Sequence, residues 1–133
     1  MRFYSIIAVA VFGILAVGGF EKASYAAEKA ITKAKGGYTV EELFAKKDKL
    51  SGKKVAVRGK VAKFSSGIMG RNWIHLQDGS GKQGTNDMTV TTNESAQVGD
   101  VVLVTGNLAT NKDFGGGYKY EVIIEDATVK VEK

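Results

Sequence analysis

The stretch KKVAVRGKVAKF, residues 53–64, alternates apolar and polar side chains with a period of two. One side of this stretch carries Val55, Val57, Gly59 and Val61. The other side carries Lys54, Ala56, Arg58, Lys60 and Ala62. Alternation of this kind is typical of a β-strand with one buried face. We therefore predict a strand over 53–64, followed by a turn at Ser65-Ser66-Gly67.

Four further strands are predicted downstream, each separated from the next by turn residues. Their ranges are 72–78, 87–92, 100–109 and 118–131. The glycine-rich segment 111–117 is predicted to be the loop before the last strand. In that strand, the apolar residues up to Ile124 have one parity and those from Ala127 onwards have the other. This change predicts a bulge or bend near Glu125-Asp126.

A short helix is predicted before the strands, at about residues 40–48. Thr39 and Glu42 have the spacing of a capping box, in which each side chain bonds the backbone of the other residue. The segment 27–37 has little apolar content, and we expect it to be a flexible arm. One helix and five strands with glycine turns favour a small closed barrel, and the OB-fold is a five-stranded barrel of this kind. The predicted fold is therefore all-β, a five-stranded OB-like barrel with one short N-terminal helix, over residues 38–133.

Residues 1–26 have the features of a secretory signal peptide. Arg2 supplies a positive charge, and an apolar run from Ser5 to Phe20 follows it. Small residues at Ser24 and Ala26 fit cleavage after Ala26. The apolar run is shorter than the roughly 20 residues that cross a bilayer, so we expect cleavage and no stable membrane span in the mature form. The sequence thus predicts a periplasmic or secreted protein.

The composition argues against catalysis. The chain has no cysteine, which excludes thiol catalysis and cysteine-ligated zinc. The aspartates at 78, 87, 100 and 113 fall in or beside predicted turns, where this residue commonly bonds its own backbone. The formal net charge of +5 is compatible with an anionic partner. We therefore predict a binding protein that is not an enzyme.

Three segments have a familiar pattern: GIMGRNWIHLQDG at 67–79, VGD at 98–100 and DFGGGYKY at 113–120. Together they resemble a family of small exported bacterial OB-fold proteins. The resemblance covers about residues 55–131. Members of this family are often labelled nucleic-acid-binding OB domains, and some are encoded near periplasmic multihaem cytochrome systems. The resemblance implies export and a barrel fold, whereas a shared fold does not by itself name a ligand.

The predicted second strand and the glycine-rich loop carry the candidate ligand-binding residues. These are Arg71, Asn72, Trp73, His75, Gln77, Lys112 and Tyr118. In OB-folds this strand, its neighbour and the flanking loops bind oligomers. Trp73 offers a ring on which a base or a sugar could stack, and Arg71 and Lys112 offer positive charge. The alternative is that Trp73 is a core residue that covers one end of the barrel.

Met69, His75 and Met88 form a second candidate set. Thioether and imidazole ligands suit Cu(I) in a protein without cysteine, and no other cofactor is expected. The alternative for Met88, at an inward-facing position, is a core residue. Three functions are compatible with the sequence: a module that binds nucleic acid or another anionic oligomer, an envelope protein that handles copper or another metal, and a protein–protein adaptor of a periplasmic redox complex.

Overall fold

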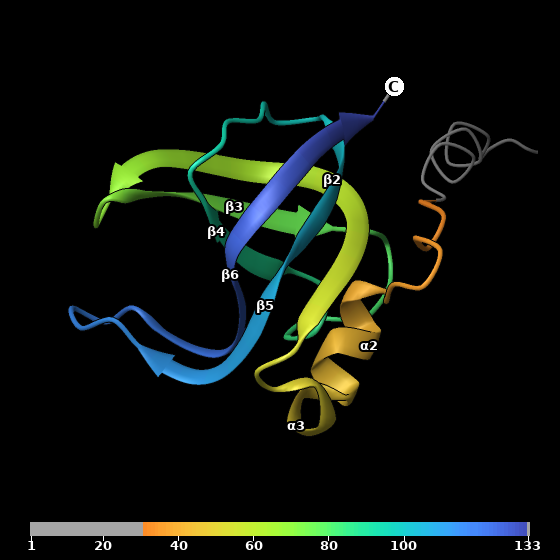
Figure 1. Ribbon diagram of the computed structural model, residues 1–133, viewed down its shortest axis with the longest axis horizontal. Helices are drawn as coiled ribbons and strands as arrows, with labels where there is room; N and C mark the ends of the chain where they lie inside the picture. The colour runs from red at the N-terminus through yellow and green to blue at the C-terminus, as the bar shows by residue number, and fades with distance from the viewer. Residues whose placement is uncertain (1–30, 133) are drawn as a thin grey trace, which may run out of the picture. The chain divides into compact units, whose positions relative to one another are not determined.

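Five strands dominate residues 31–132, the part of the chain that the computed structural model describes (Figure 1). They are β2 (Lys54–Ile68), β3 (Arg71–Gln77), β4 (Met88–Thr92), β5 (Val101–Asp113) and β6 (Lys119–Glu132). Their order is β2-β3-β4-β6-β5, and β5 pairs with β2, so the sheet closes on itself as a barrel. The predicted all-β class and the five strands are therefore confirmed. The predicted signal peptide and residues 27–30 lie outside the described residues.

The interior of the barrel is filled by the apolar side of each strand. In β2 the buried positions alternate as predicted, through Val55, Val57 and Val61. The other strands contribute buried side chains to the same core: Ile74, Leu76, Met88, Val90, Val102, Val104, Leu108, Val122 and Ile124. Each side chain of this kind that leaves water stabilises the fold by about 1.5–3 kcal/mol.

Two short helices precede the barrel, α2 (Val40–Ala45) and α3 (Lys47–Leu50). The predicted capping box is confirmed, because the Thr39 hydroxyl accepts a bond from the Glu42 amide at 3.1 Å and Glu42 accepts one from the Thr39 amide at 2.9 Å. The bond from the Thr39 backbone is the main reason that the pKa of Glu42 is lowered. Val40 and Leu43 are fully buried in the barrel core, so the helix completes that core. No helix among residues 31–132 is long and apolar enough to cross a membrane.

The described part of the predicted flexible arm, residues 31–37, is attached to the outside of β2. The Arg58 guanidinium donates to the Thr32 carbonyl at 2.9 Å, and the Ala34 side chain is buried. Arg58 also donates to Glu132 at 2.6 Å, and this bond is the main reason that the pKa of Glu132 is lowered. Arg58 thus provides residues 31–37 with a partner that the composition of the arm does not reveal.

Both long hairpins extend further than the sequence indicates. β2 continues through the predicted turn at Ser65-Ser66-Gly67, where the register with β3 shifts. The chain reverses instead at Met69-Gly70, and Ile68 pairs with Arg71. Likewise, β5 continues to Asp113, so the loop predicted at 111–117 shortens at its N-terminal end. Glycine and serine form a bulge in β2 because a bulge and a turn both require the same backbone freedom.

The two-residue turn at Met69-Gly70 has positive φ angles at both residues, 53° and 76°. This is a type I′ hairpin turn, in which asparagine followed by glycine is preferred. A left-handed conformation costs a residue such as methionine about 1–2 kcal/mol. Met69 is also 44% exposed, so little burial offsets this cost.

Met69→Asn is therefore expected to stabilise the domain by about 1 kcal/mol and to raise Tm by roughly 4–8 °C. The measurement is a thermal melt followed by circular dichroism. Met69→Leu is the control, because leucine keeps an apolar side chain with the same unfavourable φ, and its Tm should stay near that of the wild type. Equal Tm values for all three proteins would contradict the assignment of strain to this turn.

A bulge bends β6 opposite Gly106 of β5, where β6 has one more residue than β5 between successive pairs. Asp126 lies at this bulge with a φ of 53°. A Cβ atom on Gly106 would lie 2.7 Å from Ile124 Cγ2 and 3.0 Å from Ala127 Cα. The bulge predicted from the change of parity is confirmed, and glycine is required at the position that faces it.

Candidate ligand-binding face

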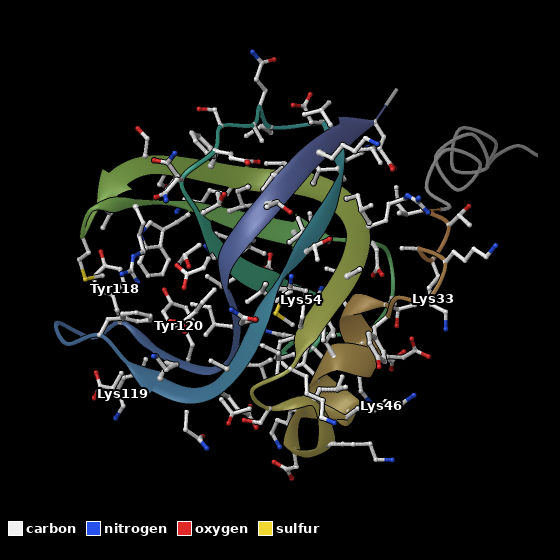
Figure 2. All side chains as sticks on the ribbon, in the orientation of Figure 1. Lys33, Lys46, Lys54, Tyr118, Lys119 and Tyr120 are labelled. Carbon is white, nitrogen blue, oxygen red and sulfur yellow. The ribbon has the colours of Figure 1, made fainter. Side chains whose placement is uncertain are left out.

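Four aromatic rings meet between the β2–β3 hairpin and the β5–β6 hairpin. The Trp73 ring lies 5.5 Å from Phe114, 6.0 Å from Tyr118 and 5.9 Å from Tyr120, measured between ring centroids. Phe114 and Tyr120 are themselves 6.1 Å apart and nearly perpendicular. Figure 2 shows Tyr118 and Tyr120 on the side of the β5–β6 hairpin that faces β3, with Lys119 on the opposite side. We call these four residues the aromatic cluster.

Trp73 projects from the outer face of β3, yet it is only 4% exposed. Its neighbour Ile74 points into the barrel, so strand alternation places Trp73 outside. There the other three rings of the aromatic cluster cover it. The indole N–H donates to the Ile68 carbonyl at 2.8 Å and so joins β3 to the tip of its own hairpin. Trp73 therefore supports the cluster, and Tyr118, which is 39% exposed, is the ring of the four that a ligand can reach most readily.

Two cations lie over the Phe114 ring. The Arg71 guanidinium carbon is 5.5 Å from the ring centroid, and the Lys112 ammonium is 5.7 Å from it. Lys112 also pairs with Glu125 at 3.4 Å, which partly neutralises its charge. Within residues 31–132 the Arg71 side chain makes no hydrogen bond and no ion pair. Its guanidinium is thus held against an aromatic ring while its donors stay free for a ligand.

Tyr120 is the partly buried phenol of the aromatic cluster. Burial raises the pKa of Tyr120, and the neighbouring Tyr118 raises it further. The phenol therefore stays protonated well above neutral pH and adds no negative charge beside Arg71. This face keeps its local positive charge.

His75 and Gln77 follow Trp73 on the same outer face of β3, and both bond to Asp87. His75 Nδ1 lies 2.8 Å from Asp87 Oδ1. The Gln77 amide donates to Asp87 Oδ2 at 2.8 Å. We call these three residues the polar group of β3. Asp87 was expected to act within a turn, but here it orients two side chains of the neighbouring strand.

Asn72 has a structural role. Its side-chain oxygen accepts a bond from the Gly67 amide at 3.1 Å, and its amide donates to the Glu94 carbonyl at 2.9 Å. It thereby ties the bulge in β2 to the chain after β4. These two bonds use one donor and one acceptor position of the Asn72 side chain.

The candidate metal residues Met69, His75 and Met88 are not brought together. Met88 is fully buried in the barrel and pairs with Leu76, whose side chain is also internal. His75 is the next residue to Leu76, and adjacent residues of a strand face opposite sides of the sheet. Met69 lies at the exposed hairpin turn. Met88 has the core role that was the alternative to metal binding.

Of the seven predicted binding residues, Arg71, Trp73, Lys112 and Tyr118 meet in or beside the aromatic cluster. His75 and Gln77 lie further along β3 in the polar group. The central Phe114 was missed, although an aromatic residue next to three glycines in a loop is an available signal. Tyr120 joins Phe114 in the cluster from the beginning of β6.

Comparison with known proteins supports the fold alone. No family model matches the chain, and no curated protein matches it. Among solved structures, the chain is similar to the OBody AM2EP06 bound to hen egg-white lysozyme, with a TM-score of 0.54 and 17% identity over 76% of this chain and 96% of that chain. It is also similar to the OBody AM1L10 bound to hen egg-white lysozyme, with a TM-score of 0.50 and 18% identity over 77% and 99%.

Proposed function

We propose that this protein is an exported, non-catalytic binding module of the OB type that binds single-stranded nucleic acid or a similar anionic oligomer. One observation carries the proposal: the free Arg71 guanidinium is held over Phe114, beside the exposed ring of Tyr118. A free guanidinium binds a phosphate or another anion, and an exposed aromatic ring stacks with a base or a sugar.

The strand order supports this proposal. The sheet runs β2-β3-β4-β6-β5, and rings of the β5–β6 hairpin contact Trp73 on the outer face of β3. In OB-folds the corresponding face and loops take up oligonucleotides and oligosaccharides. The two similar solved structures are OBodies bound to a protein, which favours a binding role for this barrel but does not name the ligand.

The signal-like sequence at residues 1–26 supports export, and the positive net charge of +5 favours an anionic ligand. Stacking of one base on Tyr118 would contribute about 1–3 kcal/mol. A charge-assisted bond from Arg71 would contribute about 1.5–3 kcal/mol. These two contacts alone correspond to weak, salt-dependent binding, as expected of a small module.

Arg71→Gln is expected to weaken binding of a fluorescent 12-nucleotide oligo-dT by about tenfold or more at low salt. The salt dependence of the binding constant should become shallower by about 0.7, the value for one phosphate contact on a single strand. The measurement is fluorescence anisotropy over a range of salt concentrations.

Lys119→Gln is the matched control, because it removes the same charge from the opposite side of the β5–β6 hairpin (Figure 2). This variant should bind oligo-dT within about twofold of the wild type. Equal losses in the two variants would mean that only net charge matters. No binding of oligo-dT by the wild type at low salt would refute single-stranded nucleic acid as the ligand.

A further inference from the structure

The polar group of β3 presents hydrogen-bond acceptors, in contrast to the cations at the other end of the same face. An ionised carboxylate such as Asp87 only accepts, so His75 donates to it from Nδ1 and Gln77 donates to it from its amide. In a neutral imidazole that donates from Nδ1, the lone pair lies on Nε2. Gln77 in turn keeps its carbonyl oxygen, Oε1, free.

Both acceptors are accessible and without a partner. No hydrogen bond is found for His75 Nε2 or Gln77 Oε1 within residues 31–132. The His75 side chain is 35% exposed and Gln77 is exposed. Because both side chains bond the two oxygens of one carboxylate, Asp87 fixes the imidazole tautomer and the orientation of the amide.

Along the outer face of β3, Arg71 supplies a cation and Trp73 an aromatic ring. His75 and Gln77 follow with one acceptor each. Residues two apart on one face of a strand are separated by about 7 Å. A ligand with an anion at Arg71 and a ring against the aromatic cluster would therefore direct its next ring edge toward His75 and Gln77. Single strands expose the Watson–Crick edges of their bases to contacts of this kind.

We propose that His75 and Gln77, oriented by Asp87, form an acceptor pair that selects guanine in a single-stranded ligand. Guanine presents two adjacent donors on its Watson–Crick edge, N1–H and the exocyclic amino group. Adenine and cytosine present one donor beside an acceptor, and thymine presents one donor between two acceptors. Two acceptors on the protein therefore match the two donors of guanine. When any of the other bases binds, at least one of the two protein acceptors is left unpaired or faces an acceptor of the base.

This inference rests on the proposed function, and the test separates the two. The probes are fluorescent 12-mers with the repeats TTG, TTA and TTI, where I is inosine, whose base lacks the exocyclic amino group of guanine. They are titrated by anisotropy at pH 8 in lithium buffer, which disfavours four-stranded structures of guanine-rich DNA. We expect the TTG strand to bind about fivefold or more tightly than the TTA and TTI strands, since a good bidentate pair discriminates by about 1–3 kcal/mol.

Gln77→Met removes one acceptor from an exposed position and should abolish the preference for TTG over TTI. Asp87→Asn should reduce the preference as well, because an amide in place of the carboxylate can donate to His75 and changes its tautomer. Circular dichroism checks that both variants fold.

Equal binding of TTG and TTI by the wild type would overturn the inference and leave the proposed function standing. A TTG preference that survives in Gln77→Met would overturn it too. No binding of any strand would refute the proposed function, and the inference would fall with it.

Discussion

Trp73→Ala is expected to destabilise the domain by about 3–5 kcal/mol, the usual cost of truncating a buried tryptophan. Trp73 contacts three other rings, and its indole N–H bonds the Ile68 carbonyl. The alanine variant loses both and leaves a cavity where the two hairpins meet. Urea denaturation followed by far-UV circular dichroism measures the change in the free energy of unfolding.

Trp73→Phe separates the hydrogen bond from the packing. It keeps an apolar ring and loses the bond to Ile68, for which we expect a cost nearer about 1–2 kcal/mol. Tyr118→Ala is a second comparison, because Tyr118 is exposed and its truncation should cost less than that of Trp73. A cost below about 1 kcal/mol for Trp73→Ala would show that the aromatic cluster does not hold the hairpins together.

Gly106→Val is expected to destabilise the domain by about 2–3 kcal/mol, through overpacking. The new Cβ would lie 2.7 Å from Ile124 Cγ2 and 2.9 Å from the Glu125 carbonyl oxygen. Backbone atoms of a neighbouring strand cannot move aside as a flexible side chain can, so the pairing of β5 with β6 must shift. The measurement is again urea denaturation, and a fall in the transition midpoint at constant m-value would show a loss of stability.

Asn107→Val is the matched control. It introduces the same side chain at the next position of β5, where the residue is exposed. Its effect should stay within about 0.5 kcal/mol, as for surface substitutions in general. If Gly106→Val were as mild as Asn107→Val, the close approach of β6 to Gly106 would not constrain the sequence.

The barrel could be predicted from the sequence because its signals are local. The period of two around Val57 and the capping box at Thr39 and Glu42 each depend on residues close together in the chain. The bulge near Asp126 was also visible, because a strand that changes parity must accommodate an extra residue. These features require no knowledge of which strand pairs with which.

The lengths of the hairpins could not be predicted in this way. Ser65-Ser66-Gly67 has the composition of a turn but forms a bulge, and the actual turn begins with Met69, which is a poor turn residue. Which of these two segments becomes the turn depends on how β2 pairs with β3. That pairing is stabilised by contacts of Trp73 with a hairpin about 40 residues later.

The candidate site likewise has a part that the local sequence predicts and a part that depends on contacts between distant segments. Strand alternation places Trp73, His75 and Gln77 on one face of β3, as the sequence indicates. Whether Trp73 is exposed depends on Phe114 and Tyr120, which reach it only because β5 continues beyond its predicted end. In the same way, Asp87 meets His75 and Gln77 only because β4 lies beside β3.

The bulge opposite Gly106 also bears on how this sequence can evolve. Without Asp126, β6 would alternate regularly, with Ile124 and Ala127 on the same side of the strand. The extra residue therefore supplies the bend and leaves the inward-facing set unchanged. We expect a side chain at Gly106 and the loss of Asp126 each to be harmful alone, and the second change to remove the obstacle to the first. The two positions are thus epistatic, and related sequences are expected to keep the glycine and the inserted residue together or to lose both.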